Sequence, residues 1–177
     1  MHPTRCASAS ASSTGATDMD YLLLKYLHVI AAVFLFGFGM GSYLYLIAAH
    51  RTGDARVIAA VARMVVRFDA WITTPAGVLQ LLTGIGMARL AGMDWSAGWL
   101  RAALLIFFAV GALWLPVLWL QMRMQALAAG AAATGAALGA TYQRLYRGWM
   151  WMGVAGFAGM FLMVVVMVFK QAPWEWF

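Results

Sequence analysis

The sequence contains four long segments with almost no charged residues. They run from about Tyr21 to Ala49, Phe68 to Arg89, Trp99 to Met122 and Gly148 to Val168. Each has at least the ~20 residues that a helix needs to cross ~30 Å of hydrocarbon. A helix satisfies its own backbone groups inside a bilayer, and the ~10-residue alternating segments of a barrel are absent. We therefore predict an all-α, polytopic membrane protein: a four-transmembrane-helix bundle.

The composition excludes an ordinary soluble domain. Of 177 residues, 64% are hydrophobic and 10% are charged, whereas a soluble domain is roughly 45–50% apolar and about 25% charged. The net charge of +6 does not indicate nucleic acid, because the basic residues flank the apolar segments and form no tract. A single cysteine, Cys6, excludes an intrachain disulfide. We expect the lipid bilayer as a partner, with other membrane subunits or a homo-oligomer as further candidates.

The domain organisation follows from the same pattern. Residues 1–18 are small and polar and are predicted to be a disordered tail, with Met19 as a candidate start of the chain. Residues 19–177 form one transmembrane domain. Between the first two segments, Ala55 to Arg67 is predicted to be a short interfacial helical turn. The small-sided stretch Ala126–Ala140 is either an extension of the third helix or an interfacial segment.

The distribution of Lys and Arg predicts the orientation. The side of the first and third loops carries seven of them: Arg51, Arg56, Arg63, Arg67, Arg123, Arg144 and Arg147. The opposite side carries five: Arg5, Lys25, Arg89, Arg101 and Lys170. Because cytoplasmic loops are enriched in basic residues, the first side is expected in the cytoplasm of a bacterial inner membrane and both termini in the periplasm.

His28 is the main candidate for a functional residue. It lies seven residues after Tyr21, roughly 10 Å inside the outer boundary. Ionisable residues at such depth are costly and suggest function, and a histidine in a helical bundle is a common axial ligand of haem iron. The alternative is an interhelical hydrogen bond to Ser, Thr or Gln. His50 lies about 33 Å further along the same helix and is assigned to the membrane surface.

Several residues share the expected layer of His28. Gln80 and Thr83 on the second segment and Met163 on the fourth are candidates for the same site, together with Met160 and Met167 at helical spacing. A methionine is a known second haem ligand, although methionines at this spacing usually pack. Three outer cations are candidates for binding haem propionates, with contact to lipid headgroups as the alternative: Lys25, Arg89 and Arg101.

The second segment carries a predicted irregularity. Pro75 within Thr73–Gly77 removes a backbone hydrogen bond and should widen the bundle, either for a cofactor or for packing. Arg63 and Arg67 lie one helical turn apart with Asp69 nearby, and either pair with it or anchor the helix in headgroups. We expect no acidic residue deep within a span, and hence no carboxylate proton relay.

The chain resembles a known family over nearly everything from Met19 onward. The runs LKYLHVIAAVFLFGFGMGSYLYLIAAHRTGD, VVRFDAWITTPAGVLQLLTG, PVLWLQ and YQRLYRGWMWMG are similar to predicted four-span bacterial integral membrane proteins of unknown function. More distantly, the layout resembles membrane protoporphyrinogen oxidases related to the copper-resistance D proteins. That resemblance implies that His28 is a haem b ligand. It does not extend to their further histidine in the third span, because Ala102–Leu120 has none.

These observations leave three hypotheses for function. The first is a haem b-binding protein for electron transfer or tetrapyrrole oxidation, with His28 as axial ligand. The second is a non-enzymatic membrane subunit or assembly factor that binds a partner through glycine-rich helix faces. The third is a small-molecule or copper permease with a methionine-lined path, since thioethers suit Cu(I). Whether the protein is an enzyme stays open.

Overall fold

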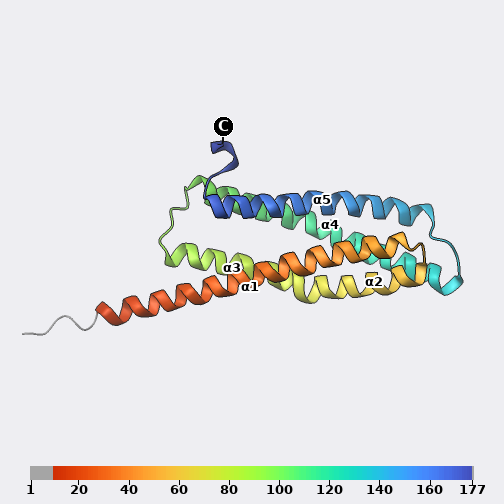
Figure 1. Ribbon diagram of the computed structural model, residues 1–177, viewed down its shortest axis with the longest axis horizontal. Coiled ribbons are helices and arrows are strands. Elements are labelled where there is room, and N and C mark those ends of the chain that lie inside the picture. Colours follow the sequence, from red (N-terminus) through yellow and green to blue (C-terminus); the bar gives the residue numbers. More distant parts are fainter. Residues whose placement is uncertain (1–9, 177) are drawn as a thin grey trace, which may run out of the picture.

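The computed structural model describes the backbone of residues 10–176 and the side chains of residues 18–176. All described secondary structure is helical (Figure 1). The elements are α1 (Ser10–Arg51), α2 (Ala55–Phe68), the π-helical η1 (Asp69–Thr73), α3 (Thr74–Leu90), α4 (Gly98–Thr134), α5 (Ala140–Phe169) and the short 3₁₀ helix η2 (Pro173–Glu175). Residues 1–9 of the expected tail lie outside the described residues, and α1 begins at Ser10, before the expected start of the first span.

The helices form two long antiparallel hairpins. In the first, α1 is followed by an arm made of α2, η1 and α3 that returns along it; in the second, α4 is followed by α5 (Figure 1). Within the hairpins, α1 packs along α2 and α3, and α4 packs along α5. The two hairpins are joined where α4 packs on α2. The packing between hairpins is therefore concentrated at the end that holds α2.

Three helices of the described residues are long and apolar enough to cross a membrane: Asp18–Arg51, Gly98–Thr134 and Ala140–Phe169. These helices contain the first, third and fourth predicted spans, and the second does not meet this criterion. The expected second span is divided between η1 and α3, and α3 has only 17 residues. The division has a local cause: Pro75 has no N–H for a regular helical bond, and the preceding turn widens so that the Thr74 N–H bonds to the Asp69 carbonyl.

Two further expectations on the loops are resolved. Ala55–Arg67 is not a short interfacial turn, because α2 is a full helix whose buried side chains belong to the core. Asp54 is the N-cap of α2, and its carboxylate accepts a hydrogen bond of 2.7 Å from the Arg56 N–H. The stretch Ala126–Ala140 mostly extends α4, which ends at Thr134 before Gly135 with φ 68°.

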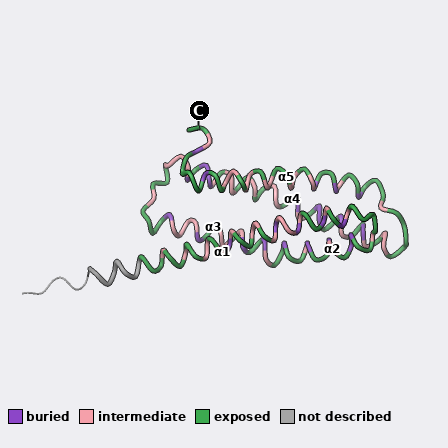
Figure 2. Tube along the Cα trace, in the orientation of Figure 1, coloured by how far each residue is buried: buried purple, intermediate pink, exposed green. Residues whose placement is uncertain are grey.

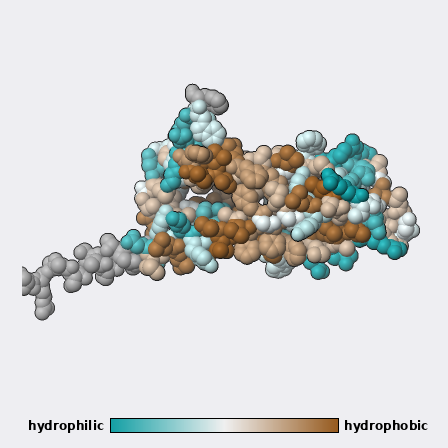
Figure 3. Space-filling model, viewed as in Figure 1, coloured by the Kyte–Doolittle hydropathy of each residue, from teal (hydrophilic) through white to brown (hydrophobic). Residues whose placement is uncertain are grey.

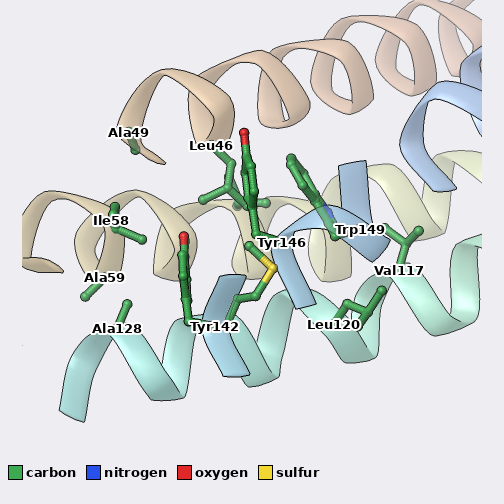
Figure 4. Packing of buried hydrophobic residues seen from close by; sticks show 13 residues of the cluster. Leu46, Ala49, Ile58, Ala59, Val117, Leu120, Ala128, Tyr142, Tyr146 and Trp149 are labelled. Carbon is green, nitrogen blue, oxygen red and sulfur yellow. The ribbon is translucent and has the colours of Figure 1, made fainter. Parts of the chain in front are cut away.

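We call the end of the molecule around α2 the closed half: α2, residues 42–51 of α1, residues 117–134 of α4 and residues 140–149 of α5. Its core is built around large side chains that are almost completely buried, Trp149, Tyr142 and Met124 (Figure 4). The Tyr43 ring packs on Trp149 with a centroid distance of 4.9 Å, and its hydroxyl donates to the Met150 carbonyl at 2.9 Å. Aromatic side chains from α1 and α5 thus fill the space between the hairpins here.

We call the remainder the open half: α3 with the preceding part of α1, the first part of α4 and the last part of α5. Buried residues are more frequent toward α2 than toward this end (Figure 2). A small second cluster ties α5 to the start of α4 through Ala102, Ala103, Val166 and Ala172. This cluster lies within the second hairpin and does not join it to the first.

Candidate intramembrane ligand site

A cavity of about 350 Å³ lies between the two hairpins. Its lining comes from α1, η1, α3, α4 and α5 and is almost entirely apolar. Figure 3 shows a hollow on one face of the open half, between α5 and α1, within an apolar part of the surface. A volume of this size is within the range of small-molecule sites, roughly 300–1,000 Å³.

Small residues keep this space open. Gly77 of α3, Gly111 of α4 and Gly156 of α5 all line the cavity. A Cβ added at Gly111 or Gly156 would meet nothing within 4 Å. In the closed half the corresponding space holds Trp149 and Tyr142. The cavity therefore results from a change in side-chain size along the helices.

A polar cluster lies where the two halves meet. Asp69, in η1, is 0% exposed; its Oδ1 accepts from the Thr73 hydroxyl at 3.1 Å and its Oδ2 from Gln121 Nε2 at 2.9 Å. The buried Ser42 of α1 contributes a further hydrogen-bonding side chain. Asp69, Thr73 and Gln121 all line the cavity. A buried carboxylate thus stands at the boundary of an apolar cavity, held by neutral donors.

Several polar atoms beside the cavity lack a partner. Among the described residues, the buried side-chain atoms without a hydrogen bond are Gln80 Oε1, Gln121 Oε1 and Trp149 Nε1. All three residues line the cavity. Buried polar groups in folded proteins are nearly always satisfied. Two acceptors and one donor in one cavity are therefore positions where a bound molecule would supply the missing hydrogen bonds.

Asp69 was missed by the sequence analysis, which considered only depth within a span; the structure buries this residue completely at the start of the expected second span. A signal for it was present in the periodicity. The inward residues of α2, Ile58, Ala62 and Val65, follow a spacing of three and four that continues through Asp69 and Thr73. Arg63 and Arg67 are exposed on the other side of the helix. This arrangement favours headgroup anchoring over an ion pair for both arginines.

His28 lies in the interface between α1 and α3. Gln80 donates from Nε2 to His28 Nε2 over 2.8 Å. The ring proton is then on Nδ1, which lies 2.9 Å from Thr83 Oγ1. The Thr83 hydroxyl in turn donates to the Leu79 carbonyl at 2.6 Å. Three residues that the sequence analysis placed in one layer are thus brought together, as a hydrogen-bonded chain that ties α1 to α3.

These contacts bear on the expected haem site. An axial ligand needs a free nitrogen lone pair, and the one lone pair of neutral His28 accepts from Gln80. The ring also lies against α3, since a Cβ on Gly84 would come within 3.1 Å of His28 Cε1. As arranged, His28 does not fit an axial ligand, and it matches the interhelical hydrogen bond that was the alternative. Binding of haem b stays a prediction.

The remaining candidates are distributed over different surfaces. Met160 and Met163 line the cavity, whereas Met167 is exposed. The three cations proposed for propionates, Lys25, Arg89 and Arg101, are exposed on three different helices. In the part of the chain that the structure describes, no group of three His, Cys, Asp or Glu side chains could hold a metal ion.

The fold and its apolar helices define a polytopic helical membrane protein. The chain belongs to the family described as "Predicted integral membrane protein (DUF2269)", whose model matches residues 22–171. The expected membership in a membrane family of unknown function is thereby confirmed. No curated protein and no solved structure is significantly similar to the chain. The more distant resemblance to protoporphyrinogen oxidases and copper-resistance D proteins receives no support.

Proposed function

We propose that this chain is a binding protein of the bacterial inner membrane that holds a membrane-soluble, mainly apolar molecule between its two hairpins. The observation that carries the proposal is the apolar cavity of about 350 Å³ in the open half. The hollow on an apolar face of the molecule supports entry of the ligand sideways from the bilayer (Figure 3). The unpartnered atoms of Gln80, Gln121 and Trp149 would fix the polar part of the ligand.

We also propose that the chain crosses the membrane four times. The support is topological: α1 and α4 run in the same direction (Figure 1), so the chain must return across the membrane between them. The arm of η1 and α3 makes this return, and its 22 residues span roughly 30 Å at the helical rise. The arginines gathered at the α2 end support a cytoplasmic position for that end and periplasmic termini.

A substitution that fills the cavity tests the binding proposal. Gly156→Leu places a large side chain in the cavity, where an added Cβ meets nothing. Gly148→Leu is a matched control on the same helix, eight residues earlier, with an equally free Cβ and outside the lining of the cavity. Both proteins and the wild type are purified in lipid nanodiscs and examined by native mass spectrometry and by organic extraction.

We expect a small molecule retained by the wild type and by Gly148→Leu and lost from Gly156→Leu. Equal retention by all three proteins, or by none, contradicts the proposal. Visible spectra of the same samples test haem b, which would show as a Soret band that His28→Ala removes. A wild type without that band, purified from haem-replete cells, removes the haem hypothesis and leaves the cavity proposal intact.

A copper permease is a second candidate, because Met152, Met160 and Met163 of α5 all line the cavity. Thioether sulfur is a soft ligand suited to Cu(I). Copper uptake into cells that express the protein should then fall when Met160 and Met163 are both replaced by Leu, which keeps the size of the side chain. Uptake that is unchanged by the double substitution removes this candidate.

A further inference from the structure

The charge balance of the cavity points to the kind of ligand it holds. Among the described lining residues there is one acidic side chain, Asp69, and no Lys, Arg or His. Asp69 is 0% exposed and its partners Thr73 and Gln121 are neutral. A buried carboxylate without a cation is costly, since desolvation is not offset by an opposite charge. A ligand with a positive charge would therefore supply the opposite charge that the lining residues do not provide.

The hydrogen-bonding groups beside Asp69 have the same preference. Gln121 donates its Nε2 to the Asp69 carboxylate, and the Oε1 of that same amide is buried with no partner. Gln121 is 3% exposed. The unpartnered side-chain atom on the residues bonded to the carboxylate is therefore an acceptor, Gln121 Oε1. An ammonium group offers three N–H donors and no acceptor, which matches this acceptor better than a carboxylate, a phosphate or a ketone does.

The aromatic side chains around the cluster add to this preference. The indole N–H of Trp114 donates to the Thr74 hydroxyl at 3.4 Å, and that hydroxyl donates to the Asp69 carbonyl at 2.7 Å. Trp149 and Tyr43 also line the cavity. Aromatic faces attract cations and repel anions. The rest of the lining is apolar and suits a hydrocarbon body.

We infer that the cavity binds an apolar molecule that carries one protonated amine, with the ammonium group on Asp69 and Gln121 Oε1 and the apolar body between α3, α4 and α5. This inference rests on the proposed function, because it assigns the chemical class of the ligand in the same cavity. In this account Asp69 is a specificity residue for charge, and the glycines of the cavity provide room for the body.

A matched pair of small molecules tests the inference. The probes are 4-phenylbutylamine, which is protonated at pH 7, and 4-phenylbutan-1-ol, a neutral molecule of nearly the same shape. Binding to the full chain in nanodiscs is measured by equilibrium dialysis, with protein-free nanodiscs of the same lipid to subtract partitioning. The variants are Asp69→Asn, which removes the charge at nearly constant size, and Asp94→Asn, a control in the exposed loop before α4.

We expect the wild type and Asp94→Asn to bind the amine roughly tenfold to a hundredfold more tightly than the alcohol. Asp69→Asn should bind both probes about equally. If the wild type binds both probes equally, the assignment of an amine is overturned while the cavity proposal stands. If it binds neither, both proposals fail. The relative affinity of the wild type for the two probes is sufficient to overturn the inference, so the test does not depend on whether Asp69→Asn folds.

Discussion

The closed and open halves of the molecule use the same four helical arms in opposite ways. In the closed half, Trp149 and Tyr142 of α5 reach the first hairpin and are 1% exposed (Figure 4). In the open half the same helix lines the cavity between the hairpins with Gly153 and Gly156. α1, α4 and α5 continue through both regions, and the fourth arm passes from α2 through η1 to α3 between them. The difference lies in the side chains, and it separates a part that holds the fold together from a part that has room for a ligand.

The boundary between the halves is where polar chemistry occurs. Asp69, Thr73 and Gln121 are buried at the π-helical segment that precedes Pro75. Short π-helical insertions in α-helices often lie at functional sites. The closed half holds η1 in a fixed position on one side. On the other side, Asp69 and Thr73 of η1 line the cavity and are accessible to a bound molecule.

The largest expected contrast comes from removing an aromatic ring in each half. Tyr142→Ala should destabilise the protein by about 3–5 kcal/mol, because Tyr142 is 1% exposed and its loss leaves a void in a filled core. Phe107→Ala, which enlarges an existing cavity, should cost about 2 kcal/mol or less, near the lower limit for large-to-small changes. Unfolding of both proteins in detergent, followed by circular dichroism, measures the difference. Equal costs would remove the distinction between the halves.

Adding one methyl group to neighbouring glycines of α5 should give effects of opposite sign. A Cβ on Gly153 would clash with the Tyr43 ring, which the hydrogen bond to Met150 holds in place. Gly153→Ala should therefore cost about 1–3 kcal/mol. Gly156→Ala meets nothing and should stabilise by up to about 1 kcal/mol through helix propensity. Thermal unfolding of the pair provides the measurement, and a stabilised Gly153→Ala protein contradicts the account.

The polar link between α1 and α3 should contribute less. His28→Leu removes the contacts with Gln80 and Thr83, and interhelical hydrogen bonds in membranes average about 0.6 kcal/mol each. We expect a loss of about 1 kcal/mol, measured by unfolding in the same detergent. Tyr43→Phe, which removes one bond to Met150, is the comparison in the closed half. A loss of several kcal/mol for His28→Leu would indicate a larger role for this histidine, such as a bound cofactor.

The smallest effect should come from the loop that joins α3 to α4. Hydrogen bonds from the Ser96 hydroxyl and N–H lower the pKa of the exposed Asp94 carboxyl below its ordinary value. This stabilisation is present above the unfolded pKa and is lost as the pH falls through the lowered folded pKa. Wild type and Asp94→Asn should thus differ slightly in melting temperature at pH 6 and converge at acid pH, once the carboxyl is protonated in both the folded and the unfolded state. A difference that grows on acidification contradicts this assignment.

The sequence predicts the helical membrane class and most of the elements because long apolar segments have few alternatives in a bilayer. The widening at Pro75 was also predicted, and the π-helical turn and the cavity lie there. Gln80, Thr83 and His28 were correctly placed in one layer by counting helical rise. What they do there depends on the direction of each side chain, and the structure shows them bonding one another.

Other features depend on packing that local sequence does not specify. Asp69 follows Arg67 by two residues, and its sequence position suggests a charged residue at a membrane boundary. It is buried because α1 packs on η1 and Gln121 of α4 bonds to its carboxylate. The bounds of α2 were predicted to within one residue, but its buried face was not predicted, because its exposed arginines suggest an interfacial segment. The cavity forms where the helices of the two hairpins do not pack closely against one another, and this depends on the packing of the whole bundle.

The central claim is that the hairpins meet in one half and enclose an apolar space in the other. An X-ray structure from a xenon-pressurised crystal tests it most directly, because xenon occupies apolar cavities in proteins. The account predicts xenon between Gly111 and Gly156 and none among the core residues Leu46, Ile58 and Met124. An open half in which α3 packs closely on α4 without bound xenon, or xenon bound equally in both halves, would contradict it.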